Sequence, residues 1–257
     1  KLTNKPIRYI INTSAEADHV GGNKDVAAAG ESVFAASPGQ RPDGGVNQAS
    51  AGASILAHEN VLARLSAPTG KVSPFGAEWW ATESFAEKRK YFYMNHEGIE
   101  VLHQPAAHSD GDSIVFFRIS DVVMAGDVLD TTRFPVVDTA KGGSIEGEIA
   151  ALNKLIELAI PPIPFVFQEG GTQVIPGHGH VYEQGDLVEY RDMVVTVRDV
   201  VQDMVKLGMT LDQIKAAGFT RDYDARYSAP SGPGSAASFL ESMYRDLSAA
   251  PAPGSKK

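Results

Sequence analysis

Residues 13–22 have the sequence TSAEADHVGG, and they follow a short run of β-branched and aromatic residues at 7–11. The run at 7–11 predicts a buried strand, and the polar residues after it predict a loop that leads into a helix. Glu16, Asp18 and His19 all lie in this loop. Because loops at strand ends are held by a rigid scaffold, this one is a candidate site for chemistry.

Three further segments place ionisable residues at the ends of predicted strands. Residues 108–113 have the sequence HSDGDS, residues 124–127 the sequence MAGD, and residues 175–179 the sequence IPGHG. Each segment alone is a weak signal, because a single histidine after a strand is more often structural and PGHG can be a plain tight turn. The order of the four segments along the chain is the stronger observation. The candidate ligands in the later segments are His108, Asp127 and His178.

The alternation of predicted strands and helices indicates the α/β class. Residues 37–60 are rich in small residues and predict a loop with a helical part, while the aromatic-rich stretch 79–93 predicts either an apolar wall for substrate or a helix packed in the core. We expect one domain over residues 1–248 and a disordered tail at 249–257. Further strands are expected at 33–36, 99–103, 113–119, 122–126 and 172–175, and helices at 24–30, 145–158, 186–207 and 238–247.

The composition narrows the classes of function. The 257 residues are 43% hydrophobic, which is enough to bury a sizeable core. A formal net charge of -9 argues against non-specific binding to nucleic acid, which depends on Lys and Arg. The absence of cysteine excludes disulfides, iron–sulfur clusters and thiolate zinc sites. No apolar run reaches the ~20 residues that a membrane helix needs, so no membrane partner is expected.

The four segments resemble the motifs of the metallo-β-lactamase superfamily. Residues 13–22 are similar to the motif THxHxDHxGG, residues 108–113 to HTxGDS, residues 124–127 to the bridging-aspartate motif and residues 175–179 to the last histidine motif. The resemblance covers about residues 7–182 and implies a four-layer αββα sandwich with a two-metal groove at one edge. It also implies that opening strands are missing before the first motif, so a second copy or an N-terminal fragment is expected to complete the sheet.

The resemblance implies metal ligands, with one departure from the family pattern. Ser14 and Glu16 stand where the family has two histidines. A serine hydroxyl is a poor ligand, whereas a glutamate is competent but differs in charge and hardness. One metal in the second site, two metals with Glu16 and water completing the first site, and no metal all stay open. The ion is expected to be zinc, with iron or manganese also suited, and the implied ligands are Asp18, His19, His178 and the bridging Asp127 in the second site, and Glu16 and His108 in the first.

The implied activity is metal-assisted hydrolysis of an ester, lactone, amide or related bond in a small molecule, with Asp18 or Glu16 orienting the water. One alternative is a degenerate relative with a binding or structural role, motivated by Ser14 and Glu16. Another is a di-iron oxidoreductase, because the di-iron flavoproteins of the superfamily also carry a glutamate at the position of Glu16.

Other residues and the compartment are less constrained. Residues 133–138 and 142–144 resemble a stretch that lines the groove mouth in bacterial relatives, and a plain loop is the alternative. His180 is expected to face solvent or substrate rather than the metal. An exported or periplasmic location is favoured over the cytoplasm, because an export signal could have preceded Lys1.

Overall fold

The chain divides into two compact units, Lys1–Glu87 and Lys88–Lys257, and each contains its own β-sheet. None of the helices within the described ranges is long and apolar enough to cross a membrane. The structure is a computed structural model that describes residues 4–33, 52–67, 72–163 and 170–249.

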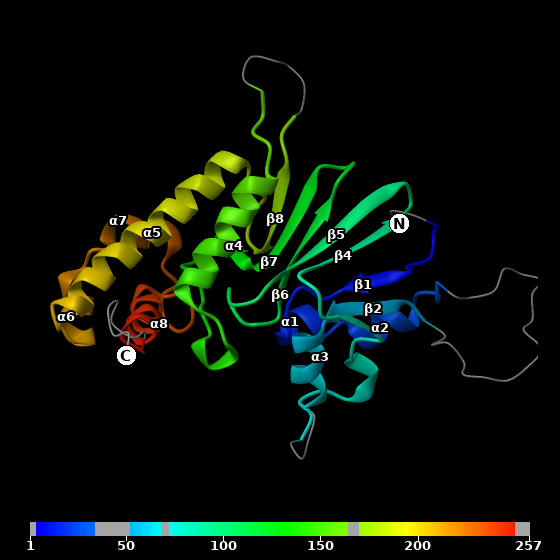
Figure 1. The fold of residues 1–257 in the computed structure, drawn as a ribbon, viewed down its shortest axis with the longest axis horizontal. Helices are drawn as coiled ribbons and strands as arrows, with labels where there is room; N and C mark the ends of the chain where they lie inside the picture. Colours follow the sequence, from blue (N-terminus) through cyan, green and yellow to red (C-terminus); the bar gives the residue numbers. More distant parts are fainter. Residues whose placement is uncertain (1–3, 34–51, 68–71, 164–169, 250–257) are drawn as a thin grey trace, which may run out of the picture. The chain divides into compact units, whose positions relative to one another are not determined.

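The Lys1–Glu87 unit contains a parallel sheet with the strand order β1-β2-β3 (Figure 1). Helix α2 contacts both β1 and β2, and α3 packs against β2 and β3. The segment predicted at 7–11 does form the first strand, and the helix predicted at 24–30 is α2. The elements are β1 (Tyr9–Ile11), α1 (Ala17–Val20), α2 (Asn23–Ala28), β2 (Ser54–His58), α3 (Glu59–Ser66), a 3-10 turn at Ala77–Trp79 and β3 (Glu83–Phe85).

Two predictions for the first third of the chain are wrong. Residues 54–58, which were expected in a loop, form the central strand β2, and all five are buried. Because a central parallel strand is covered on both faces, its side chains show no alternation that would mark it. For the aromatic stretch 79–93 the helix alternative is wrong, since the residues form a 3-10 turn followed by extended strands, and the alternative of an apolar wall for substrate stays a prediction. The strand predicted at 33–36 and the tail at 249–257 fall almost wholly outside the described residues.

The Lys88–Lys257 unit contains a five-stranded sheet with the order β4-β5-β6-β7-β8. Its pairs are antiparallel except for β7 and β8, which are parallel. Figure 1 shows α4 beside β7 and α5 beside α4. The elements are β4 (Arg89–Met94), β5 (Glu97–Gln104), β6 (Asp112–Phe117), β7 (Val122–Asp130), a 3-10 turn at Thr139–Lys141, α4 (Ile145–Leu158), β8 (Gln173–His178), α5 (Gln184–Lys206), α6 (Leu211–Ala217), α7 (Arg221–Tyr227) and α8 (Ala236–Ala249).

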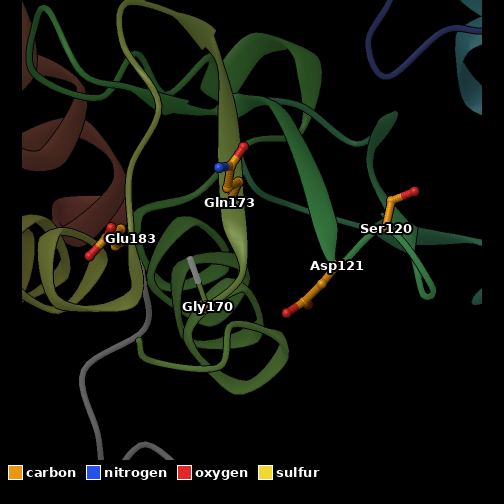
Figure 2. A pocket seen from close by; sticks show the side chains of 6 residues that line it. Ser120, Asp121, Gly170, Gln173 and Glu183 are labelled. Atoms are coloured by element: carbon orange, nitrogen blue, oxygen red, sulfur yellow. The ribbon is translucent and has the colours of Figure 1, made fainter. Parts of the chain in front are cut away.

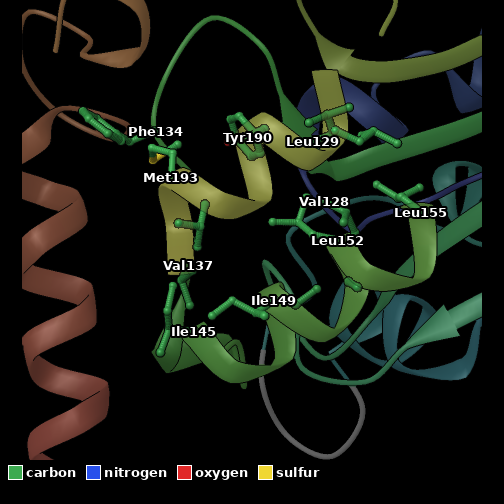
Figure 3. Close-up of a cluster of buried hydrophobic side chains, with 14 of the residues drawn as sticks. Val128, Leu129, Phe134, Val137, Ile145, Ile149, Leu152, Leu155, Tyr190 and Met193 are labelled. Carbon is green, nitrogen blue, oxygen red and sulfur yellow. The ribbon is translucent and has the colours of Figure 1, made fainter. Parts of the chain in front are cut away.

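Helix α4 spans the residues that the apolar spacing predicts. Its first turn is capped by Ser144, whose hydroxyl accepts a hydrogen bond from the Gly147 amide at 3.0 Å. The apolar side chains recur at three- and four-residue spacing and face the core (Figure 3). Phe134 and Val137, from the loop after β7, enter the same core. The loop that follows Asp127 is therefore anchored by buried side chains.

Candidate metal centre

His108 lies in the turn between β5 and β6, and a backbone carbonyl orients its ring. The ring Nδ1 is 2.6 Å from the carbonyl oxygen of Val136. A carbonyl only accepts, so Nδ1 carries the hydrogen and Nε2 is the nitrogen that can bind a metal. The residue is only 8% exposed, which limits the positions that the ring can take. His108 is therefore held in the tautomer and orientation of a metal ligand.

The turn that carries His108 is fastened to residues 138–144. The amide of Asp138 donates to the carbonyl of His108 at 2.9 Å, and the amide of Ser144 donates to the carbonyl of Ala106 at 2.9 Å. These bonds tie the histidine turn to the segment that leads into α4. The glycine-rich residues before α4 thus support the His108 turn.

Asp127 lies within β7, which continues past the predicted strand end at residue 126. Its carboxylate faces the His108 ring. The pairing of β7 with β8 is irregular between Gly126 and Asp130, and such irregularities commonly aim side chains at sites. Asp127 Oδ2 is 4.0 Å from His108 Nε2. Two donors on a tetrahedral zinc ion lie about 3.4 Å apart, so this pair would have to close by roughly half an ångström to share one ion. The donor types, an imidazole nitrogen and a carboxylate oxygen, fit a transition-metal ion.

His178 is the last residue of β8, beside the end of β7. The backbone of Gly177 lies against the Asp127 carboxylate, since a Cβ added at Gly177 would be 3.3 Å from Asp127 Oδ1. The Thr131 amide donates to the His178 carbonyl at 3.0 Å. The second unit therefore brings together the His108 ring, the Asp127 carboxylate and the turn that carries His178.

Two buried carboxyl groups accompany His108. Asp112 accepts hydrogen bonds from the amide and hydroxyl of Ser109, and burial raises the pKa of Asp112 to about 7. Glu148 on α4 is 1% exposed, and neither of its carboxyl oxygens has a hydrogen-bond partner among the described residues. Burial, and then the nearby charge of Asp112, raise the pKa of Glu148 well above its ordinary range. The sequence analysis missed Glu148, although it falls on the apolar stripe of α4, three residues after Ile145.

The first-motif loop of the Lys1–Glu87 unit is anchored by two asparagines that the sequence analysis also missed. The side-chain amides of Asn12 and Asn23 exchange hydrogen bonds of 2.9 and 2.8 Å, and both residues are 2% exposed. Asn12 Nδ2 also donates to the carbonyl of His19 at 3.2 Å. Their positions, directly after a strand and at the start of a helix, were the available signal.

Within this loop the predicted site residues differ in their surroundings. His19 Nδ1 is 3.0 Å from the Thr13 hydroxyl, so Nε2 is the ring nitrogen that a metal could use. Asp18 is exposed on α1. Ser14 is fully buried, and its hydroxyl accepts a hydrogen bond from the Glu16 amide at 3.1 Å. Ser14 therefore stabilises the turn rather than offering a ligand.

A cavity of about 530 Å³ also lies in the Lys88–Lys257 unit, at the opposite end of β8 from His178 (Figure 2). Figure 2 shows Asp121 and Ser120 on the turn between β6 and β7, and Gln173 at the start of β8. None of the predicted ligands contributes to it. It is lined by Ser120, Asp121, Gly170, Gly171, Gln173 and Glu183.

Residues 1–178 match the sequence model of the metallo-β-lactamase superfamily. This chain belongs to that superfamily. The match runs through all four motifs and ends at His178, before α5 begins. The expected family and the expected α/β class, with two sheets and their helices, are thereby confirmed.

Solved metallo-β-lactamases resemble this superfamily member at low identity. One from Pontibacter korlensis has a TM-score of 0.48 at 17% identity, covering 74% of this chain and 69% of that chain. The BLEG-1 B3 metallo-β-lactamase has a TM-score of 0.48 at 20% identity, with coverages of 73% and 77%. The DIM-1 metallo-β-lactamase exposed to ceftazidime has a TM-score of 0.47 at 16% identity, with coverages of 72% and 66%. A search of curated proteins returned no match.

Proposed function

We propose that this metallo-β-lactamase superfamily member is a metal-dependent hydrolase that cleaves an ester, lactone, amide or related bond in a small molecule. The observation that carries the proposal is the pairing of His108 with Asp127. Nδ1–H of His108 is engaged by the Val136 carbonyl, and Nε2 lies 4.0 Å from the Asp127 carboxylate. A ligand histidine is commonly oriented in this way by an acceptor on its other nitrogen.

The proposed ligands come from all four sequence motifs and retain the family order. Zinc is the proposed ion, and iron or manganese also suits these oxygen and nitrogen donors. A bound zinc ion supplies an acidified water and a Lewis acid for the scissile bond. Asp18 or Glu16 is proposed to orient the water. The proposed ligand set is Asp18, His19, Asp127 and His178 around one ion, with Glu16 and His108 available to a second.

Ser14 favours a second candidate, a family member with a binding role and no catalysis. Its hydroxyl is engaged by the Glu16 amide in a buried turn, so one family ligand is replaced by a structural group. The two candidates differ in metal content and hydrolysis. Protein purified without chelators should contain one or two zinc ions and hydrolyse generic esters. Absence of metal, with no activity after metal addition, would support the binding role, and two iron ions with oxygen or nitric-oxide reduction would support an oxidoreductase.

A matched pair of variants tests the proposed role of His108. His108→Asn should lower the affinity for the second zinc ion by more than the ~10–100-fold that follows the loss of an outer partner, because an amide binds zinc poorly. Ester hydrolysis should fall with it. His96→Asn is the control, because His96 is exposed in a turn with a positive φ that asparagine tolerates. Equal zinc binding by the two variants would remove His108 from the ligand set.

A further inference from the structure

Thr131 connects the end of β7 to both sides of the turn that carries His178. The Thr131 amide donates to the His178 carbonyl at 3.0 Å, and the Thr131 hydroxyl accepts from the His180 amide at 2.9 Å. The hydroxyl is also 3.2 Å from His180 Nδ1 and 3.5 Å from the His178 carbonyl oxygen. Thr131, which is 4% exposed, therefore holds His178 chiefly through its amide and His180 through its hydroxyl.

The turn is closed tightly around this hydroxyl. Gly179 has a φ of +104°, and a Cβ there would lie 2.0 Å from Thr131 Oγ1. Only glycine adopts this conformation with the hydroxyl in place. The His178–His180 backbone is therefore shaped around Thr131.

Thr131 is itself held in place by its neighbours. The carboxylate of Asp130 accepts from the Thr132 amide at 2.9 Å and from the Thr132 hydroxyl at 2.6 Å, and it forms an ion pair with Arg133. These contacts restrain the backbone on both sides of Thr131.

We propose that Thr131 is a positioning residue that fixes the His178 backbone, so that the His178 ring is held ready to bind the metal. The inference rests on the proposed function and deepens it. The hydrogen bonds of Thr131 go to the backbone of residues 178 and 180 and to the His180 ring. Thr131 acts through the two backbone groups that flank Gly179 and so determines where the last ligand of the site points. The Thr131 amide makes the shorter bond to the His178 carbonyl, while the hydroxyl accepts from the His180 amide and lies 3.5 Å from the His178 carbonyl oxygen. Removal of the hydroxyl should therefore loosen the turn around Gly179 and weaken metal binding.

The test is a zinc titration of the full chain against a chromophoric chelator. Thr131→Val removes the hydroxyl at constant shape and should lower zinc affinity by about 10–100-fold, the usual effect of removing a group that orients a ligand. Thr131→Ser keeps the hydroxyl and should restore the affinity. Should Thr131→Val fold poorly, Thr131→Ala against Thr131→Ser gives the same contrast.

Thr172→Val is the matched control at the other end of β8. Thr172 is fully buried, and its hydroxyl accepts from the Ile160 amide at 2.7 Å and donates to Asp121 at 2.7 Å. Its loss should lower the thermal midpoint, as Thr131→Val should, but leave zinc affinity unchanged. A merely structural role for Thr131 predicts that both variants behave alike.

Hydrogen exchange of metal-free protein gives a second readout. The His180 amide should exchange faster in Thr131→Val than in Thr131→Ser, because its acceptor is gone. If the parent protein binds zinc and Thr131→Val binds it with the same affinity, this inference is overturned and the proposed function stands. A parent protein that binds no metal would overturn the proposed function, and the positioning role would fall with it.

Discussion

The two units support their candidate ligands to different extents. In the Lys88–Lys257 unit, His108 is buried, its ring is fixed by the Val136 carbonyl, and its turn is hydrogen-bonded to residues 138–144. In the Lys1–Glu87 unit, Asp18 is exposed on the four-residue helix α1. Two asparagines anchor this loop at its ends. The second unit thus holds its candidate ligands in a hydrogen-bonded framework. The first unit carries a candidate carboxylate that is exposed.

Both departures from the motif, Ser14 and Glu16, fall in the first-motif loop, where the Ser14 hydroxyl accepts a hydrogen bond from the Glu16 amide. His108, Asp127 and the His178 turn keep the family residues within a dense framework. A change in that framework should therefore disturb both stability and metal binding, whereas a change at Ser14 should disturb stability alone.

Phe134→Ala should give the largest effect, because it removes the anchor of the supporting loop. Phe134 is fully buried, stacks on Phe239 at 5.0 Å and packs against Tyr227. Loss of a buried phenylalanine costs about 3–5 kcal/mol of unfolding free energy. Val136 lies two residues further on, so zinc affinity should fall by about 10–100-fold as its carbonyl is displaced from His108.

Chemical denaturation and zinc titration measure these two effects of Phe134→Ala. Phe117→Ala is the control, because Phe117 is only half-buried at the end of β6. The control should lose less stability and keep its zinc affinity. If Phe134→Ala loses stability but binds zinc like the parent, the framework does not position His108, and the contrast between the two units fails.

Glu148→Gln should have a smaller effect that depends on pH. The folded-state pKa of Glu148 is raised by burial and by Asp112, so the stability that its neutral form provides is present below the unfolded pKa of ~4.5. That stability is lost as the pH rises toward the folded-state pKa, with a slope of up to ~1.4 kcal/mol per pH unit. The glutamine variant lacks this slope, so its stability relative to the parent should rise with pH.

The measurement for Glu148 is the unfolding free energy of metal-free protein between about pH 4 and 8. Glu146→Gln, on the same helix, is the control, since Glu146 is exposed and pairs with Arg198. Its difference from the parent should change little over this range. Parallel pH profiles for Glu148→Gln and the parent would mean that Glu148 is not held as a neutral group in the folded state.

Much of the fold follows from local signals in the sequence. Helix α4 has the predicted bounds, 145–158, because its apolar spacing and the Ser144 cap agree. Strand β2 was missed because a strand buried on both faces has no alternation. The helix alternative for 79–93 failed because Tyr91 and Tyr93 occupy alternate, exposed positions of strand β4.

The six ligands stay a prediction that rests on side-chain types and motif order. The groups that hold these side chains in place act through the backbone, which the sequence does not reveal. The contacts of the Val136 carbonyl and of Thr131 form only when separate loops meet in the folded protein. The residue types at those positions do not predict them. Glu148 could have been noticed as a charge on an apolar stripe, whereas its neighbour Asp112 is brought close only by the tertiary fold.

Ser14→Ala should give the smallest loss of stability of these variants. It tests the comparison of the two units at a residue of the first unit. It leaves the Glu16 amide without its acceptor, which should cost about 0.5–1.5 kcal/mol of unfolding free energy. Zinc content should stay unchanged, because the hydroxyl serves the turn and not the metal. Thr13→Val, one residue earlier, removes the hydroxyl 3.0 Å from His19 Nδ1 and should instead weaken zinc binding by about tenfold. Loss of zinc in Ser14→Ala, measured by elemental analysis beside Thr13→Val, would mean that Ser14 is a ligand after all and that the first-motif loop keeps more of the family site than its hydrogen bonds indicate.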